Sequence, residues 1–211
     1  MNSLAGKAAL ASIPAAGIAG TGAYFGVIKP SLNKETIKSK LEKENKGRSR
    51  RILDLASDGI WAKFRVLYKN AEPSKKIQGV EDSELPSWCE TTLKKYYSEK
   101  EYSHASEWCV ANTNTLKLEL ESKGLNFITF ENSDSTKWQN AWTKYEKDKS
   151  SLEIEDASLK NIQSNDATAG GSKLQAWCKA KLDKYMYEDL GESKTMEKVE
   201  KYCVTSRASA D

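Results

Sequence analysis

Four cysteines are the residues of this chain whose types and spacing most directly suggest chemistry. Each one directly follows an aromatic residue, in Trp88-Cys89, Trp108-Cys109, Trp177-Cys178 and Tyr202-Cys203. Four cysteines allow three disulfide connectivities. Because the placement is duplicated, we predict the bridges Cys89 with Cys109 and Cys178 with Cys203, each worth about 3 kcal/mol by the chain-entropy model. The alternative is four buried free thiols that pack as small apolar side chains.

The other reactive residue types do not form a recognisable catalytic or metal-binding motif. His104 is the single histidine, so a site with two histidine ligands is excluded, and no two cysteines are spaced closely enough for a zinc site. Phosphate-binding glycine loops, dinucleotide fingerprints, GxSxG and HExxH do not occur, and no pair of carboxylates is singled out for hydrolysis. We therefore expect no catalytic residue, no cofactor, no metal and no enzymatic activity, with His104 at the surface or at a helix cap. A hydrolase built on two carboxylates is the alternative.

The N-terminal part of the chain is apolar. No charged residue occurs between Lys7 and Lys29, so residues 8–28 are long enough to cross a hydrocarbon layer of about 30 Å as one helix. Ala and Gly dominate this stretch, and Pro14 interrupts it. We expect residues 1–30 to be an uncleaved membrane anchor. A cleaved secretory signal and a buried Ala/Gly-rich helix are the two alternatives.

A basic segment follows at residues 31–51, which we expect to form a stalk beside the membrane. Its cations are Lys34, Lys38, Lys40, Lys43, Lys46, Arg48, Arg50 and Arg51, against three carboxylates. Close to anionic lipid headgroups, each cation contributes about 1 kcal/mol of attraction. The alternative is a solvated helix face or a flexible stalk without a ligand. We expect no contact with nucleic acid, because no aromatic residue lies between Lys34 and Arg51.

Two features predict opposite orientations of the body relative to a membrane. The excess of Lys and Arg on the C-terminal side of residues 8–28 favours a cytoplasmic body under the positive-inside rule. Disulfides, in contrast, form in oxidising compartments outside the cytoplasm. We expect an extracellular body. A cytoplasmic-facing scaffold or regulatory module with reduced cysteines is the alternative.

The body contains two similar stretches. Trp61, Phe64 and Tyr68 recur as Trp138, Ala141 and Tyr145, and the stretch from Leu85 to Glu99 recurs from Leu174 to Glu188. We therefore divide the body into two diverged helical repeats, residues 52–130 and 131–211. Residues 164–172 are rich in Ser, Asn and Gly, and we expect them to form a loop insertion in the second repeat.

The spacing of apolar residues predicts a mostly α-helical body. Trp61, Phe64 and Tyr68 stand at i, i+3 and i+7, which places them on one face of a helix. We expect these aromatic side chains to form the core and not a ligand cage. Residues 116–123 are rich in Lys, Leu and Glu and are assigned to a helix that ends at Gly124, with a short strand hairpin as the alternative.

These features together resemble a known group of proteins. An Ala/Gly-rich apolar N-terminus, a lysine-rich body, Trp-x6-Tyr helices and paired Trp-Cys dipeptides are similar to those of the large paralogous families of uncharacterised proteins in haemotropic mycoplasmas. The resemblance covers essentially the whole chain. It implies a membrane-anchored or surface protein that contacts the host-cell surface or varies as an antigen, and it supplies no catalytic residues.

Overall fold

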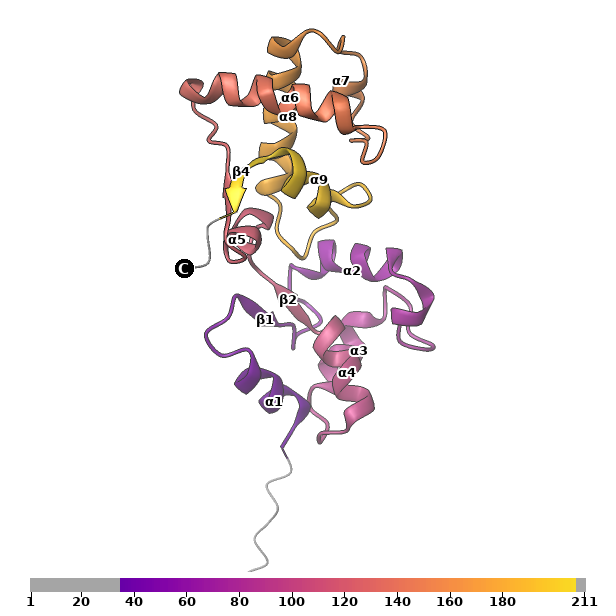
Figure 1. Ribbon diagram of the computed structural model, residues 1–211. Helices are drawn as coiled ribbons and strands as arrows, with labels where there is room; N and C mark the ends of the chain where they lie inside the picture. Colours follow the sequence, from indigo (N-terminus) through magenta and orange to yellow (C-terminus); the bar gives the residue numbers. More distant parts are fainter. Residues whose placement is uncertain (1–34, 208–211) are drawn as a thin grey trace, which may run out of the picture. The chain divides into compact units, whose positions relative to one another are not determined.

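The computed structural model describes residues 35–207, which form a mostly helical body (Figure 1). The predicted α-helical class is therefore confirmed for this part of the chain. The segment expected to be an anchor, residues 1–30, lies outside the described residues. Among residues 35–207, no helix combines the length and the apolar character needed to cross a membrane.

The first half of the body, residues 35–112, consists of helices closed by a pair of strands. Its elements are α1 (Ile37–Glu44), β1 (Arg50–Ile52), α2 (Trp61–Asn70), the 3-10 helix η1 (Pro73–Lys75), α3 (Leu85–Thr92), α4 (Glu99–Trp108) and β2 (Val110–Asn112). β1 pairs antiparallel with β2, so the two strands of this half lie side by side. Leu53, Leu85 and Leu93 are fully buried in its core.

The second half, residues 115–207, follows nearly the same order of elements. They are α5 (Leu116–Glu121), β3 (Leu125–Phe127), the 3-10 helix η2 (Asn132–Asp134), α6 (Ser135–Asp148), α7 (Ala157–Lys160), α8 (Ala167–Leu182), α9 (Thr195–Tyr202) and β4 (Val204–Arg207). β3 pairs antiparallel with β4. The helix expected before Gly124 is thus present as α5, and Gly124 turns the chain into β3 with a φ of 79°. By this order the second half begins at α5, earlier than residue 131, the boundary expected from the sequence.

Equivalent residues make equivalent contacts in the two halves. The Tyr68 hydroxyl accepts a hydrogen bond from the backbone amide of Ile77 at 3.0 Å, and the Tyr145 hydroxyl accepts one from the amide of Ile154 at 3.4 Å. Each tyrosine also meets a second ring edge to face: Tyr68 meets Trp108, and Tyr145 meets Tyr202, with centroids 4.9 Å and 5.2 Å apart. The two halves therefore share these two contacts as well as nearly the same order of elements.

The segment expected to be a basic stalk belongs to the folded body from residue 35 onward. Ile37 and Leu41 of α1 are 0% and 1% exposed, and β1 is paired with β2. The expectation of a stalk is therefore wrong for residues 35–51. Two apolar residues at i and i+4 attach one face of an otherwise charged helix to the core.

Most of the stretch expected to be a loop insertion, residues 164–172, forms the start of α8. The helix begins at Ala167, and the carboxylate of Asp166 caps it by accepting a hydrogen bond from the amide of Ala169 at 3.0 Å. Gly170 and Gly171 are buried against residues 138–142 of α6, a helix that lies across α8 (Figure 1). The expectation of a loop is wrong from residue 167 because this contact outweighs the poor helix propensity of glycine.

Candidate functional site

The four cysteines form the two predicted disulfides, Cys89–Cys109 and Cys178–Cys203. The bridged Cα atoms are 5.5 Å and 5.8 Å apart, within the usual range for disulfides. All four side chains are fully buried. Each bridge joins α3 or α8 to the residue that ends the next helix and precedes a strand. The predicted pairing is confirmed, and the alternative of free thiols is wrong.

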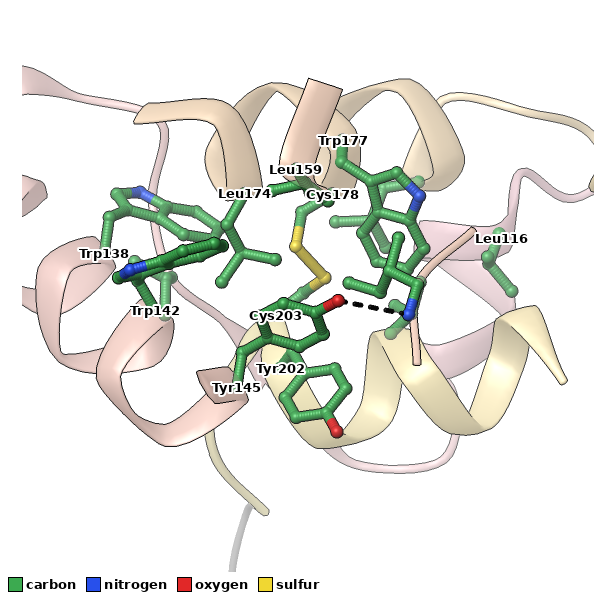
Figure 2. Packing of buried hydrophobic residues seen from close by; sticks show 14 of the residues in the cluster. Leu116, Trp138, Trp142, Tyr145, Leu159, Leu174, Trp177, Cys178, Tyr202 and Cys203 are labelled. Carbon is green, nitrogen blue, oxygen red and sulfur yellow. Dashed lines mark hydrogen bonds between the residues drawn. A yellow bond between two sulfur atoms is a disulfide. The ribbon is translucent and has the colours of Figure 1, made fainter. Parts of the chain in front are cut away.

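Aromatic residues lie around the bridge Cys178–Cys203 of the second half (Figure 2). Trp61, Phe64 and Tyr68 in the first half and Trp138, Trp142 and Tyr145 in the second are at most 6% exposed. The interpretation of these side chains as core residues is therefore confirmed. They bury the large apolar area that two small helical units need in order to fold.

The basic residues expected beside a membrane form mostly ion pairs within the body. Lys34 lies outside the described residues. Lys38 pairs with Glu42 and Asp54, Lys40 with Glu44, Lys43 with Glu35, Arg50 with Glu119 and Arg51 with Asp58. Lys46 and Arg48 are exposed and form no ion pair within residues 35–207. Much of the cationic charge is thus locally balanced, as in the solvated helix face that was the alternative interpretation.

His104 lies in the middle of α4 and not at a helix cap. It is partly buried and lines a surface cavity of about 510 Å³ together with Trp88, Ser98 and Lys100. In the part of the chain that the structure describes, no group of three or more His, Cys, Asp or Glu side chains is arranged to hold a metal ion.

A buried ion network holds the loop of residues 183–194 between α8 and α9. The Glu192 side chain is 4% exposed and accepts hydrogen bonds from the Trp177 indole N–H at 2.9 Å, the Lys198 ammonium at 2.7 Å and the Glu155 backbone amide at 3.0 Å. The Lys181 ammonium lies 3.3 Å from the same carboxylate. Lys198 is itself 3% exposed, so the two opposite charges depend on each other for solvation.

Glu192 should stabilise the fold only while its carboxylate is ionised. Burial alone would raise the pKa of Glu192, but the hydrogen bonds from the Glu155 amide, Lys198 and Trp177 hold the pKa below its ordinary value of 4.5. A carboxyl group whose pKa is lower in the folded state than in the unfolded state stabilises the fold at pH values above the unfolded-state pKa. This stabilisation is lost as the pH falls through the pKa of the folded state. We expect Glu192→Gln to lower the free energy of unfolding by about 2 kcal/mol at neutral pH, and by less in acid.

Urea denaturation of both proteins across this pH range measures the effect. The matched control is Glu197→Gln, because the Lys194–Glu197 pair is exposed and should contribute little. A loss for Glu192→Gln that stayed the same from neutral to acid pH would contradict the electrostatic explanation.

No sequence pattern indicates this network. Its members come from the segment before α7, from α8, from the loop after α8 and from α9, and charged residues in a loop are ordinarily solvated. The one indication in the sequence is the position of Lys198. When Cys203 is aligned with Cys109, Lys198 corresponds to His104, which lines the cavity of the first half.

The described residues therefore provide two buried disulfides, two aromatic cores, one buried ion network and a cavity beside His104. Comparisons of the chain with protein-family models, with curated proteins and with solved structures find no match.

Proposed function

We propose that the chain is a membrane-anchored protein that displays its helical body outside the membrane, where the body contacts a host or is presented as a variable antigen. The observation that carries this proposal is the pair of disulfides, which use all four cysteines. Structural disulfides persist in oxidising compartments and are rare in the cytosol. The uncharged residues 8–28 would supply the anchor.

The duplicated organisation supports a binding or display role. We propose that the body consists of two copies of one unit, because both halves share their order of elements, their strand pairing and the position of their disulfide. Each copy is stabilised internally by its own bridge. Surface residues can therefore change without loss of the core, which is the property that variation in exposed residues requires.

A cytoplasmic-facing scaffold or regulatory module is the second candidate. It is favoured by the Lys and Arg residues that follow residues 8–28, since the positive-inside rule counts these cations and not the net charge. In this case all four cysteines would be reduced in the cell. The two candidates therefore differ in both the accessibility and the oxidation state of the thiols.

Labelling of intact cells with a membrane-impermeant thiol reagent tests the proposal. We expect the native cysteines to react without lysis, and only after treatment with an impermeant reductant, because all four are buried in disulfides. The variant Ser122→Cys adds an exposed thiol that reports accessibility independently of the bridges. Labelling of this thiol only after lysis, with native cysteines that need no reductant, would establish the cytoplasmic alternative.

A further inference from the structure

The cavity of about 510 Å³ in the first half has the lining of an anion-binding site. Trp88 lies at its wall with His104 from α4 and Ser98 from the start of that helix. The other polar lining residues are Lys76, Gln78, Lys100 and Glu101. Trp88 is partly exposed there. Within residues 35–207, neither its indole N–H nor that of the fully buried Trp142 donates a hydrogen bond, whereas Trp61, Trp108, Trp138 and Trp177 each donate one.

The second half shows what occupies the equivalent place. Trp88 precedes Cys89 as Trp177 precedes Cys178. With Cys109 aligned to Cys203, the fully buried Ala105 corresponds to Val199, which is also fully buried. The same alignment matches His104 with Lys198. It also replaces the match of Ser98 with Tyr187 by a match of Ser98 with Glu192, because the extra residues of the longer loop in the second half are placed after Tyr185, which still corresponds to Tyr96. The cavity of the first half therefore corresponds to the position that the Glu192 carboxylate fills in the second half.

The two halves differ here in the length of one side chain, Ser98 against Glu192, and in the length of the loop that carries it. Glu192 reaches Trp177 and leaves that indole 4% exposed. Ser98 is too short to do the same, and its hydroxyl donates instead to the Glu101 carboxylate at 3.0 Å. The loop between α3 and α4 is also shorter, residues 93–98 against residues 183–194. The position beside Trp88 in the first half is therefore open, whereas the equivalent position beside Trp177 in the second half is filled by the Glu192 carboxylate.

The charges around the cavity favour an anion. The Glu101 carboxylate is already neutralised by the Lys95 ammonium at 2.6 Å. Lys76 lies at the cavity with its ammonium donating to the Lys69 carbonyl at 2.7 Å, and Lys100 adds a second cation to the lining. A carboxylate entering beside Trp88 would therefore meet an indole N–H donor and positive charge.

We propose that this cavity binds a carboxylate-bearing ligand, placed against Trp88 and His104 as the Glu192 carboxylate is placed against Trp177 and Lys198. The volume is more than sufficient for the side chain of one acidic amino acid. The proposal goes beyond the display function and does not depend on the side of the membrane on which the body lies. It can be tested with the purified, oxidised protein alone.

The test follows the indole N–H signals of the full chain in detergent by NMR. The chain has six tryptophans, and Trp88→Phe assigns the signal of Trp88. We expect N-acetyl-glutamate N-methylamide to shift this signal saturably, and the uncharged glutamine analogue to have at least ten-fold weaker effect. A second titration uses a longer acidic peptide. Binding ten-fold tighter than that of N-acetyl-glutamate N-methylamide would identify a polypeptide segment as the ligand, and equal binding would identify a small carboxylate.

Variants of the cavity separate a specific site from general attraction of anions. Ser98→Glu supplies the missing carboxylate, so it should shift the Trp88 signal by itself and weaken binding of the added ligand by more than ten-fold. Ser106→Glu places the same charge on an exposed position of α4 outside the cavity and should leave binding unchanged. Unchanged signals from the other tryptophans show that each variant is folded.

Three results would overturn the proposal. They are a Trp88 signal that does not saturate, an equal response to the glutamine analogue, and unaltered binding in Ser98→Glu. His104→Lys, which installs the residue found at the equivalent position of the second half, should tighten binding about three-fold, since it places a permanent cation beside the carboxylate.

Discussion

Reduction of both disulfides is expected to remove about 6 kcal/mol from the free energy of unfolding, with about 3 kcal/mol for each bridge. A typical domain has only about 5–15 kcal/mol of stability in total, so the reduced body should be largely unfolded at moderate temperature. The reason is that each bridge closes a loop, of sequence separation 20 or 25, in the unfolded chain. Urea denaturation followed by circular dichroism, with and without reductant, measures the difference.

Removal of one bridge at a time provides the matched comparison. The double variants Cys89→Ala with Cys109→Ala and Cys178→Ala with Cys203→Ala should each lose about 3 kcal/mol, because the two loops are of similar length. Alanine is preferred to serine, since all four sites are fully buried and a hydroxyl there would lack a solvent partner. A loss below about 1 kcal/mol for both variants would show that the bridges do not restrict the unfolded chain as the chain-entropy model requires.

Gly170→Ala is expected to destabilise the second half by about 3 kcal/mol, although alanine is ordinarily the better residue in a helix by about 1 kcal/mol. A Cβ at this position would stand 2.2 Å from ring carbons of Trp142, whose side chain is fully buried and cannot move without disturbing the core. Thermal or urea denaturation of the oxidised protein measures the loss.

Two further variants identify the cause. Gly59→Ala is the control, because a Cβ there meets nothing within 4 Å, and its effect should stay within about 0.5 kcal/mol. Trp142→Leu makes room for the added methyl group. In a protein that carries Trp142→Leu, Gly170→Ala should therefore lower the free energy of unfolding by at most about half as much as in the original chain. Equal costs in both backgrounds would exclude the clash with Trp142 as the reason.

The pairing of the cysteines could be predicted from the sequence because the same aromatic-cysteine dipeptide occurs at equivalent places in both halves. The helix of Trp61, Phe64 and Tyr68 could also be predicted, since a buried face repeats every three or four residues. Both signals are local or are duplicated along the chain. They do not depend on knowing which segments meet in space.

The features that the sequence did not reveal all depend on contacts between distant segments. Gly170 and Gly171 are typical of a loop by propensity, and only the close approach of α6 explains their position inside α8. The segment of residues 35–51 is dominated by charge, and its attachment rests on Ile37 and Leu41. In the same way, Glu192 has no local pattern that distinguishes it from a solvated loop residue.

The antiparallel strand pairs determine how the body would respond to mechanical force. Arg50 lies opposite Asn112, and Leu125 lies opposite Arg207, so the outward-leading ends of each strand pair are adjacent. Tension along the chain would first detach the helix before each strand pair, α1 or α5. It would then break the hydrogen bonds between the two strands one at a time, starting from the end at which the force acts. The stretches between Cys89 and Cys109 and between Cys178 and Cys203 would stay out of the extended length, because covalent bonds close them. Under tension, the strand pair of each half would separate at low force, but the extended length of that half would be limited by its disulfide.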